Sequence, residues 1–205
     1  MKTRIVAVAS LVMLTIASTA FAAGTGSSML AVGVGQAKAN TLGPIGLQFD
    51  ETNAGAQYWY MFSEDYALTL SGAVAFGSIK IEDSGPTPSE EKYTLSGYRF
   101  RVGGDRVGQV GDRFTVYFGP GVEYQSAKLK FEETGSPDSE SENSTTFALN
   151  GRIGGIMWLS DVVGISGEIS NSLGFASYEE GDTKFTWMPN SINAFWALTF
   201  AFGGN

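Results

Sequence analysis

The chain has 205 residues, no histidine, no cysteine and a formal net charge of −8. Without histidine it lacks the usual general base, the commonest metal ligand and every Ser-His or Cys-His pair, so the sequence predicts no enzyme and no metal site. We also expect no cofactor. The acidic excess argues against nucleic acid as a partner, because binding to phosphates needs a basic surface.

The start of the chain has the pattern of a cleavable signal peptide, which we place at residues 1–22. Lys2 and Arg4 precede an apolar run at 5–16, and Ala20-Phe21-Ala22 supplies a small-x-small cleavage site. The alternative is a retained membrane anchor, but the apolar run is short of the ~20 residues that a spanning helix needs. We therefore expect export from the cytoplasm and a single domain over residues 23–205.

Eight segments of that domain alternate between bulky apolar and small or polar residues, which is the period-two signature of a β-strand. In chain order they are 29–38, 54–63, 65–82, 92–103, 113–131, 145–159, 162–177 and 191–203. In the clearest segment, Leu68 and Leu70 lie on one face and Ala67 and Thr69 on the other. Pro120 interrupts the fifth segment, so we expect a bulge or an edge-like distortion there.

The connections between these segments alternate between short and long. Residues 63–65 and 160–161 are tight turns, and the turn-rich segment 103–112 is somewhat longer. The other connections are long and polar, at 39–53, 83–91, 132–144 and 178–190. This alternation predicts an all-β fold, an eight-stranded antiparallel up-and-down transmembrane β-barrel, with short turns in the periplasm and long loops outside the cell.

The long loops and their edges carry most of the acidic residues. These are Asp50, Glu51, Glu82, Asp83, Glu90, Glu91, Glu132, Glu133, Asp138, Glu140, Glu142, Glu179, Glu180 and Asp182. One interpretation is a solvated, self-repelling outer surface. The other is binding of divalent cations or of a cationic extracellular partner, including bridging to lipopolysaccharide. No spacing matches an EF-hand calcium loop.

Aromatic residues gather near both ends of the predicted strands. Phe62, Tyr66, Phe114, Trp158 and Phe202 fall near the short-turn ends, and Tyr93, Phe131, Phe147, Phe175 and Tyr178 near the loop ends. An ordinary hydrophobic core is one explanation. Two belts at the lipid–water boundaries explain the placement better.

If the bulky faces point to lipid, several charged residues must point into the barrel. Strand parity places Arg99, Arg101, Glu123, Arg152 and Glu168 in the lumen. An eight-stranded barrel is barely wide enough for its own side chains, so buried charges there must be paired. These residues form either an internal salt-bridge plug or the polar constriction of a narrow pore.

With these features the chain resembles the small bacterial outer-membrane β-barrels, the group that includes the OmpA transmembrane domain and the OmpX/Ail adhesin-like proteins. The resemblance covers the domain at pattern level and includes residues 117–124 (YFGPGVEY) and 194–202 (AFWALTFAF). The family ends its last strand with a terminal aromatic residue that the barrel-assembly machinery recognises. Here Phe202 is followed by Gly203, Gly204 and Asn205, which departs from that pattern.

The resemblance implies residence in the outer membrane of a Gram-negative bacterium, with membrane lipid, lipopolysaccharide and the barrel-assembly machinery as partners. It implies a non-enzymatic role in envelope integrity or in surface interaction, as in adhesins. A narrow pore for small solutes is one alternative. A soluble periplasmic ligand-binding β-barrel with its bulky faces turned inward is another. We expect a monomer, because a closed sheet leaves no edge to pair.

Overall fold

The computed structural model describes residues 26–42, 47–83, 89–133, 139–180, 183–188 and 190–203. The predicted signal peptide lies outside these residues. The strands are β1 (Ser28–Leu42), β2 (Leu47–Met61), β3 (Tyr66–Asp83), β4 (Ser89–Val110), β5 (Phe114–Glu133), β6 (Ser139–Trp158), β7 (Val163–Glu180), β8 (Thr183–Trp187) and β9 (Asn190–Phe202). Among the described residues, no helix has both the length and the apolar character needed to cross a membrane.

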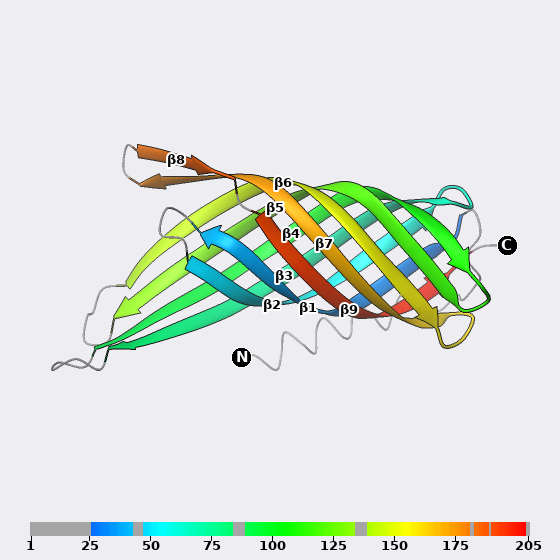
Figure 1. The fold of residues 1–205 in the computed structure, drawn as a ribbon, viewed down its shortest axis with the longest axis horizontal. Coiled ribbons are helices and arrows are strands. Elements are labelled where there is room, and N and C mark those ends of the chain that lie inside the picture. Colours follow the sequence, from blue (N-terminus) through cyan, green and yellow to red (C-terminus); the bar gives the residue numbers. More distant parts are fainter. Residues whose placement is uncertain are drawn as a thin grey trace.

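The strands form one closed antiparallel barrel (Figure 1). Each of β1 to β7 pairs with the next strand in the chain, and β9 lies between β7 and β1 to close the ring. β8 pairs with the outer end of β7 and projects with it away from β6 as a hairpin (Figure 1). The barrel itself therefore has eight strands, as the sequence predicts.

The two faces of the strands point as the alternation predicts. Leu68 and Leu70 are each 46% exposed, whereas Ala67 and Thr69 are 1% and 0% exposed. The same pattern around the barrel gives an outer belt that includes Val34, Phe76, Phe100, Val102, Phe118, Val122, Leu149, Ile153, Ile165, Ile169, Trp196 and Leu198. The soluble alternative, which turns the bulky faces inward, is therefore wrong.

Short turns join the strands at one end of the barrel, at residues 62–65, 111–113 and 159–162. The turn-rich connection predicted at 103–112 is wrong, because β4 continues to Val110 and only 111–113 turn. Gly111 takes a φ of +67° there, a conformation that glycine adopts without strain. Gly103 instead lies against the guanidinium of Arg101, where a side chain would not fit.

At the opposite end the predicted long loops are mostly strand. β1 and β2 pair as far as Leu42 and Leu47, β3 and β4 as far as Asp83 and Ser89. β5 and β6 continue in the same way as far as Glu132 and Ser139. The sequence hides an extension such as residues 139–144 of β6, which are polar at every position, because a strand that is wetted on both faces needs no apolar alternation. Every acidic residue assigned to the loops lies on a strand, except Asp138 and Asp182, which lie outside the described residues.

Pro120 disturbs one ladder without shifting its register. β4 pairs with β5 up to Gly103 and again from Arg106, with no pair for the two β4 residues between them. The register on the β6 side runs through Pro120 without a break. A proline has no N–H to donate, so a local gap is the expected result. The predicted distortion is thus a gap in pairing, and a bulge is not formed.

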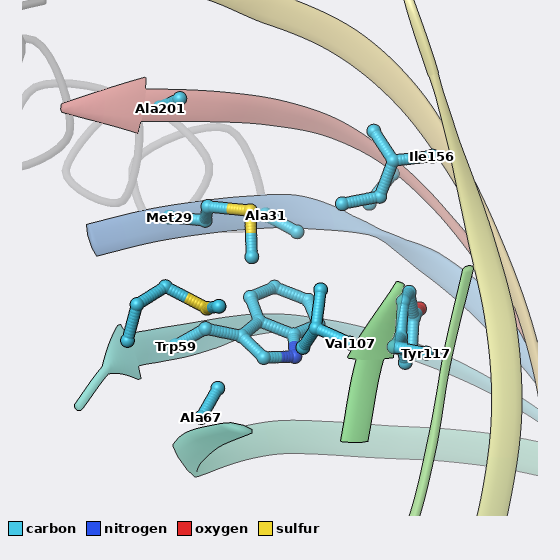
Figure 2. Packing of buried hydrophobic residues seen from close by; sticks show 10 residues of the cluster. Met29, Ala31, Trp59, Ala67, Val107, Tyr117, Ile156 and Ala201 are labelled. Atoms are coloured by element: carbon cyan, nitrogen blue, oxygen red, sulfur yellow. The ribbon is translucent and has the colours of Figure 1, made fainter. Parts of the chain in front are cut away.

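The short-turn half of the lumen is filled by an apolar cluster (Figure 2). Its members are Met29, Ala31, Trp59, Met61, Ala67, Val107, Tyr117, Ile156, Ala197 and Ala201. The rings of Trp59 and Tyr117 meet edge to face, with centroids 5.4 Å apart. Side chains of this size leave little free space in so narrow a barrel.

The predicted aromatic belts are described in part. Phe62, Tyr66 and Phe114 are exposed at the short-turn end, and Phe147 and Phe175 at the other end. The side chains of Tyr93, Phe131 and Tyr178 lie outside the description. The prediction that Trp158 belongs to the outer belt is wrong. Trp158 has the inward parity of Ile156, packs against the apolar cluster and donates its indole N–H to Thr115 Oγ1 at 2.8 Å.

Candidate functional site

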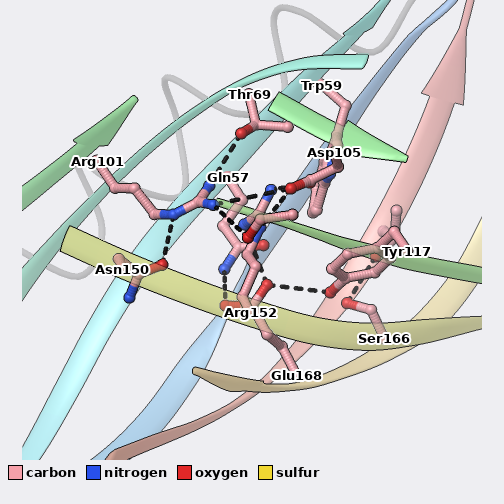
Figure 3. A network of polar contacts seen from close by, with 12 residues as sticks. Gln57, Trp59, Thr69, Arg101, Asp105, Tyr117, Asn150, Arg152, Ser166 and Glu168 are labelled. Carbon is pink, nitrogen blue, oxygen red and sulfur yellow. Dashed lines mark hydrogen bonds and ion pairs between the residues drawn. The ribbon is translucent and has the colours of Figure 1, made fainter. Parts of the chain in front are cut away.

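A buried ion-pair network crosses the lumen beside the apolar cluster (Figure 3). Its centre is Arg152 on β6, whose side chain is completely buried. The guanidinium donates from Nε to Asp105 Oδ1 at 3.2 Å and from Nη2 to Asp105 Oδ2, which makes the pair bidentate. Its Nη1 donates to Glu168 Oε2 at 3.0 Å. One cation thus joins carboxylates from β4 and β7 across the barrel.

Two aromatic side chains complete the surroundings of this centre. Trp59 Nε1 donates to Asp105 Oδ2 at 3.0 Å, and the Tyr117 hydroxyl donates to Glu168 Oε2 at 3.2 Å. The guanidinium carbon of Arg152 lies 5.2 Å from the ring centroid of Trp59 and 5.4 Å from that of Tyr117. Cation–π contacts of this kind are stronger when the cation is desolvated.

Arg101 on β4 forms the second cationic position. It donates from Nε to Asn150 Oδ1 at 2.7 Å and from Nη1 to Thr69 Oγ1 at 2.9 Å. Its Nη2 donates to the Gly119 carbonyl at 3.3 Å and lies 3.7 Å from Asp105 Oδ1. Buried arginine is tolerated when its donors are satisfied in this way.

Glu123 on β5 lies on the loop side of these arginines. Ser172 Oγ donates to its Oε1 at 3.1 Å, and Gln125 Nε2 donates to the same oxygen. Asn150 Nδ2 donates to Oε2 at 3.5 Å, and Arg99 Nε lies 4.0 Å from Oε1. The Arg99 side chain is 15% exposed, so the network meets water on this side.

No protein-family model matches the sequence, and no curated protein matches it. Among solved structures, Ail of Yersinia pestis in complex with the heparin analogue sucrose octasulfate is 16% identical, with a TM-score of 0.52. That match covers 87% of this chain and 99% of Ail. Neisserial surface protein A is 11% identical with a TM-score of 0.51, over 86% of this chain and 97% of the other.

The fold is that of the small eight-stranded outer-membrane β-barrels. At these identities the likeness is one of fold. Details of the lumen therefore have to be argued from this barrel's own residues.

All five charged residues that the sequence predicts in the lumen have side chains that point into the barrel. Arg152 contacts Glu168 directly, and Arg99 lies beside Glu123. Arg101 takes its carboxylate contact from Asp105, which the sequence analysis placed in a turn. The sequence does contain a signal that Asp105 points inward. Asp105 is odd-numbered, as Arg99 and Arg101 are, and all three lie on the continuous strand β4.

The network balances its own charge. Each of the arginines has a carboxylate within 4.0 Å, and the carboxylates also accept hydrogen bonds from neutral groups. Among the described residues, no group of three or more Asp or Glu side chains lies close enough to hold a metal ion. The arrangement is suited to cross-linking strands and filling the lumen.

Proposed function

We propose that the protein is a non-enzymatic outer-membrane barrel with a closed lumen that acts at the cell surface through its extended strands. One observation carries the proposal: four strands, β3 to β6, continue as a sheet beyond the closed barrel (Figure 1). The end of the molecule opposite the short turns thus carries a β-sheet that extends beyond the barrel wall.

Both edges of this outer sheet are unpaired in the described chain. β3 pairs with β4 to Asp83 but with β2 only to Phe76. β6 pairs with β5 to Ser139 but with β7 only from Thr145. The free β6 edge is about 20 Å long at ~3.3 Å per residue. Unpaired strand edges offer backbone N–H and C=O groups to an extended partner segment.

The outer sheet is also acidic. Its register sets Glu82 opposite Glu90 and Glu91 opposite Glu133, and Glu140 and Glu142 follow on β6. Like charges in directly opposed positions repel one another and destabilise the pair. A cationic partner removes this repulsion, which favours a basic extended segment over a neutral one.

The outer-membrane placement is tested by cell fractionation and by gel mobility with and without boiling. We expect recovery in the outer membrane and a mobility shift that needs boiling, because the exposed apolar belt requires lipid and the closed ladder resists detergent. Recovery in the soluble periplasmic fraction, or stable conductance of the purified barrel in a planar bilayer, would contradict the proposal.

The surface role predicts binding of a basic peptide to the β3–β6 tip. Purified barrel in lipid vesicles should bind an extended oligolysine peptide, and binding should weaken as salt rises because the interaction is between exposed charges. The combined variant Glu90→Gln, Glu91→Gln and Glu133→Gln should bind several-fold more weakly. The matched control is Glu179→Gln with Glu180→Gln on the β7–β8 hairpin, which should bind as the parent does. Equal losses in both variants would show that general charge, not this sheet, attracts the peptide.

A further inference from the structure

A polar cavity of about 50 Å³ lies in the lumen on the loop side of the ion-pair network. Arg99, Arg101, Glu123 and Glu168 form part of its wall. Asn53, Gln57, Ser170 and Asn193 form another part. A cavity needs roughly 10–15 Å³ of such space for each water, so this one has room for about three or four waters or for one small solute of similar size.

Three polar atoms at this cavity have no partner within the described chain. Asn193 is 4% exposed, and neither its Nδ2 nor its Oδ1 makes a hydrogen bond. Gln57 is 7% exposed, and its Oε1 is also unpaired. Leaving buried polar atoms unpaired is costly, because each has given up its hydrogen bonds to water without a replacement. The unpaired groups line the same space, so one bound molecule can satisfy them together.

The orientation of these amides defines what the cavity offers. Gln57 donates from Nε2 to Glu168 Oε1 at 3.3 Å, which fixes its carbonyl as the group left free. For Asn193 the assignment of N and O does not matter, because both atoms are unpaired. The cavity therefore presents one amide donor and two carbonyl acceptors.

The charges in the wall do not select an ion. Glu168 is paired with Arg152 at 3.0 Å, Arg101 lies 3.7 Å from Asp105, and Arg99 lies 4.0 Å from Glu123. A bound ion would leave one sign uncompensated in a buried place. A neutral molecule adds hydrogen bonds without disturbing these pairs.

Water reaches the cavity from the loop side. The Arg99 side chain in its wall is 15% exposed, and the next inward positions on β3, β4 and β5 carry the small residues Ala75, Gly97 and Ala127. The apolar cluster closes the opposite side. The cavity is thus a compartment that is open to water on the loop side and closed toward the short turns.

We propose that this compartment binds a small neutral amide of the urea class. Such a molecule has one carbonyl to accept from Asn193 Nδ2, and amino groups to donate to Asn193 Oδ1 and Gln57 Oε1. Its few heavy atoms match the space available. This lumenal site is separate from the β3–β6 tip, so the two proposals are tested independently.

The test is a titration of the folded, ¹⁵N-labelled barrel in detergent micelles with millimolar urea, followed by NMR of the side-chain amides. We expect saturable shifts of the Asn193 and Gln57 amide signals in the parent. Asn193→Leu should weaken the saturable binding at least about tenfold, because it removes two hydrogen bonds. The matched control is Asn190→Leu, an exposed asparagine on the same strand, which should titrate as the parent does.

A second variant keeps the test decisive if Asn193→Leu does not fold. Gln57→Met retains the length of the side chain and removes the free carbonyl, so it should also weaken binding. Tetramethylurea keeps the carbonyl but lacks donors, and we expect no saturable shift with it. Shifts that rise linearly with urea, or that persist unchanged in the folded Asn193→Leu or Gln57→Met variants, would show that the cavity holds water only and would overturn the proposal.

Discussion

Arg152→Ala is expected to lower the free energy of unfolding of the barrel by about 3–5 kcal/mol. The substitution leaves the carboxylates of Asp105 and Glu168 buried in the lumen without the cation that joins them. It also removes the group that lies over the rings of Trp59 and Tyr117. Denaturant titration of the barrel in lipid vesicles, read as the fraction that keeps its unboiled gel mobility, measures the loss.

Arg106→Ala is the matched control for this experiment. Arg106 lies on β4, next to Asp105, but its side chain points outward and is exposed, so its removal should change stability by no more than about 0.5 kcal/mol. A double variant, Arg152→Met with Glu168→Gln, should recover much of the loss, because the Arg101–Asp105 and Arg99–Glu123 pairs that remain are balanced. If Arg152→Ala were as stable as Arg106→Ala, the network would not hold the strands together.

Most of the fold follows from the alternation of residues in the sequence. A period of two assigns each residue to a face, and the exposed bulky face fixes which side meets lipid. The inward placement of Arg99, Arg101, Glu123, Arg152 and Glu168 follows from the same parity. The pattern is strong wherever one face meets hydrocarbon and the other meets the lumen, since the two faces then need opposite chemistry.

The pattern fails where this contrast is absent. Residues 139–144 of β6 are polar at every position and were predicted as a loop, whereas β3, β4 and β5 were predicted as strands to within three residues of their outer ends. The segment 103–112 was predicted as a turn because it is rich in glycine, although Asp105 and Val107 keep the inward parity of the strand. The parity of Trp158, which is that of Arg152 and Ile156, also predicts an inward side chain. Its position at a strand end instead suggested the outer aromatic belt.

The partners within the lumen could not be predicted from one sequence. Trp59 donates to Asp105 from 46 residues away, and Tyr117 donates to Glu168 from 51 residues away. These contacts cross the barrel between strands that are not neighbours, so they depend on strand tilt and stagger, which parity does not give. The unpaired amides of Gln57 and Asn193 are visible only once that geometry is known.

Gly33→Ala is expected to impair closure of the barrel. Gly33 lies on β1 opposite Ala197 of β9, in the ladder where the first and last strands meet. A methyl group there would lie 1.8 Å from the carbonyl oxygen of Trp196 and 2.6 Å from Cα of Ala197. Both are backbone atoms and cannot rotate away, so the strands themselves must separate. Overpacked sites commonly cost about 1–3 kcal/mol, and a clash with backbone belongs at or above the upper end of that range.

The matched control is Gly151→Ala on β6, where an added methyl group meets no heavy atom within 4 Å. We expect it to fold as the parent does, or slightly better, since alanine loses less backbone entropy on folding than glycine. Both variants are compared by the yield of the unboiled, fast-migrating band after refolding into lipid vesicles, and by the denaturant midpoint. A strong loss of yield and a lower midpoint for Gly33→Ala, with normal values for Gly151→Ala, would show that β1 and β9 must approach closely at Gly33. Equal yields and midpoints would mean that the seam can widen by the size of a methyl group, and that closure of this barrel does not depend on glycine there.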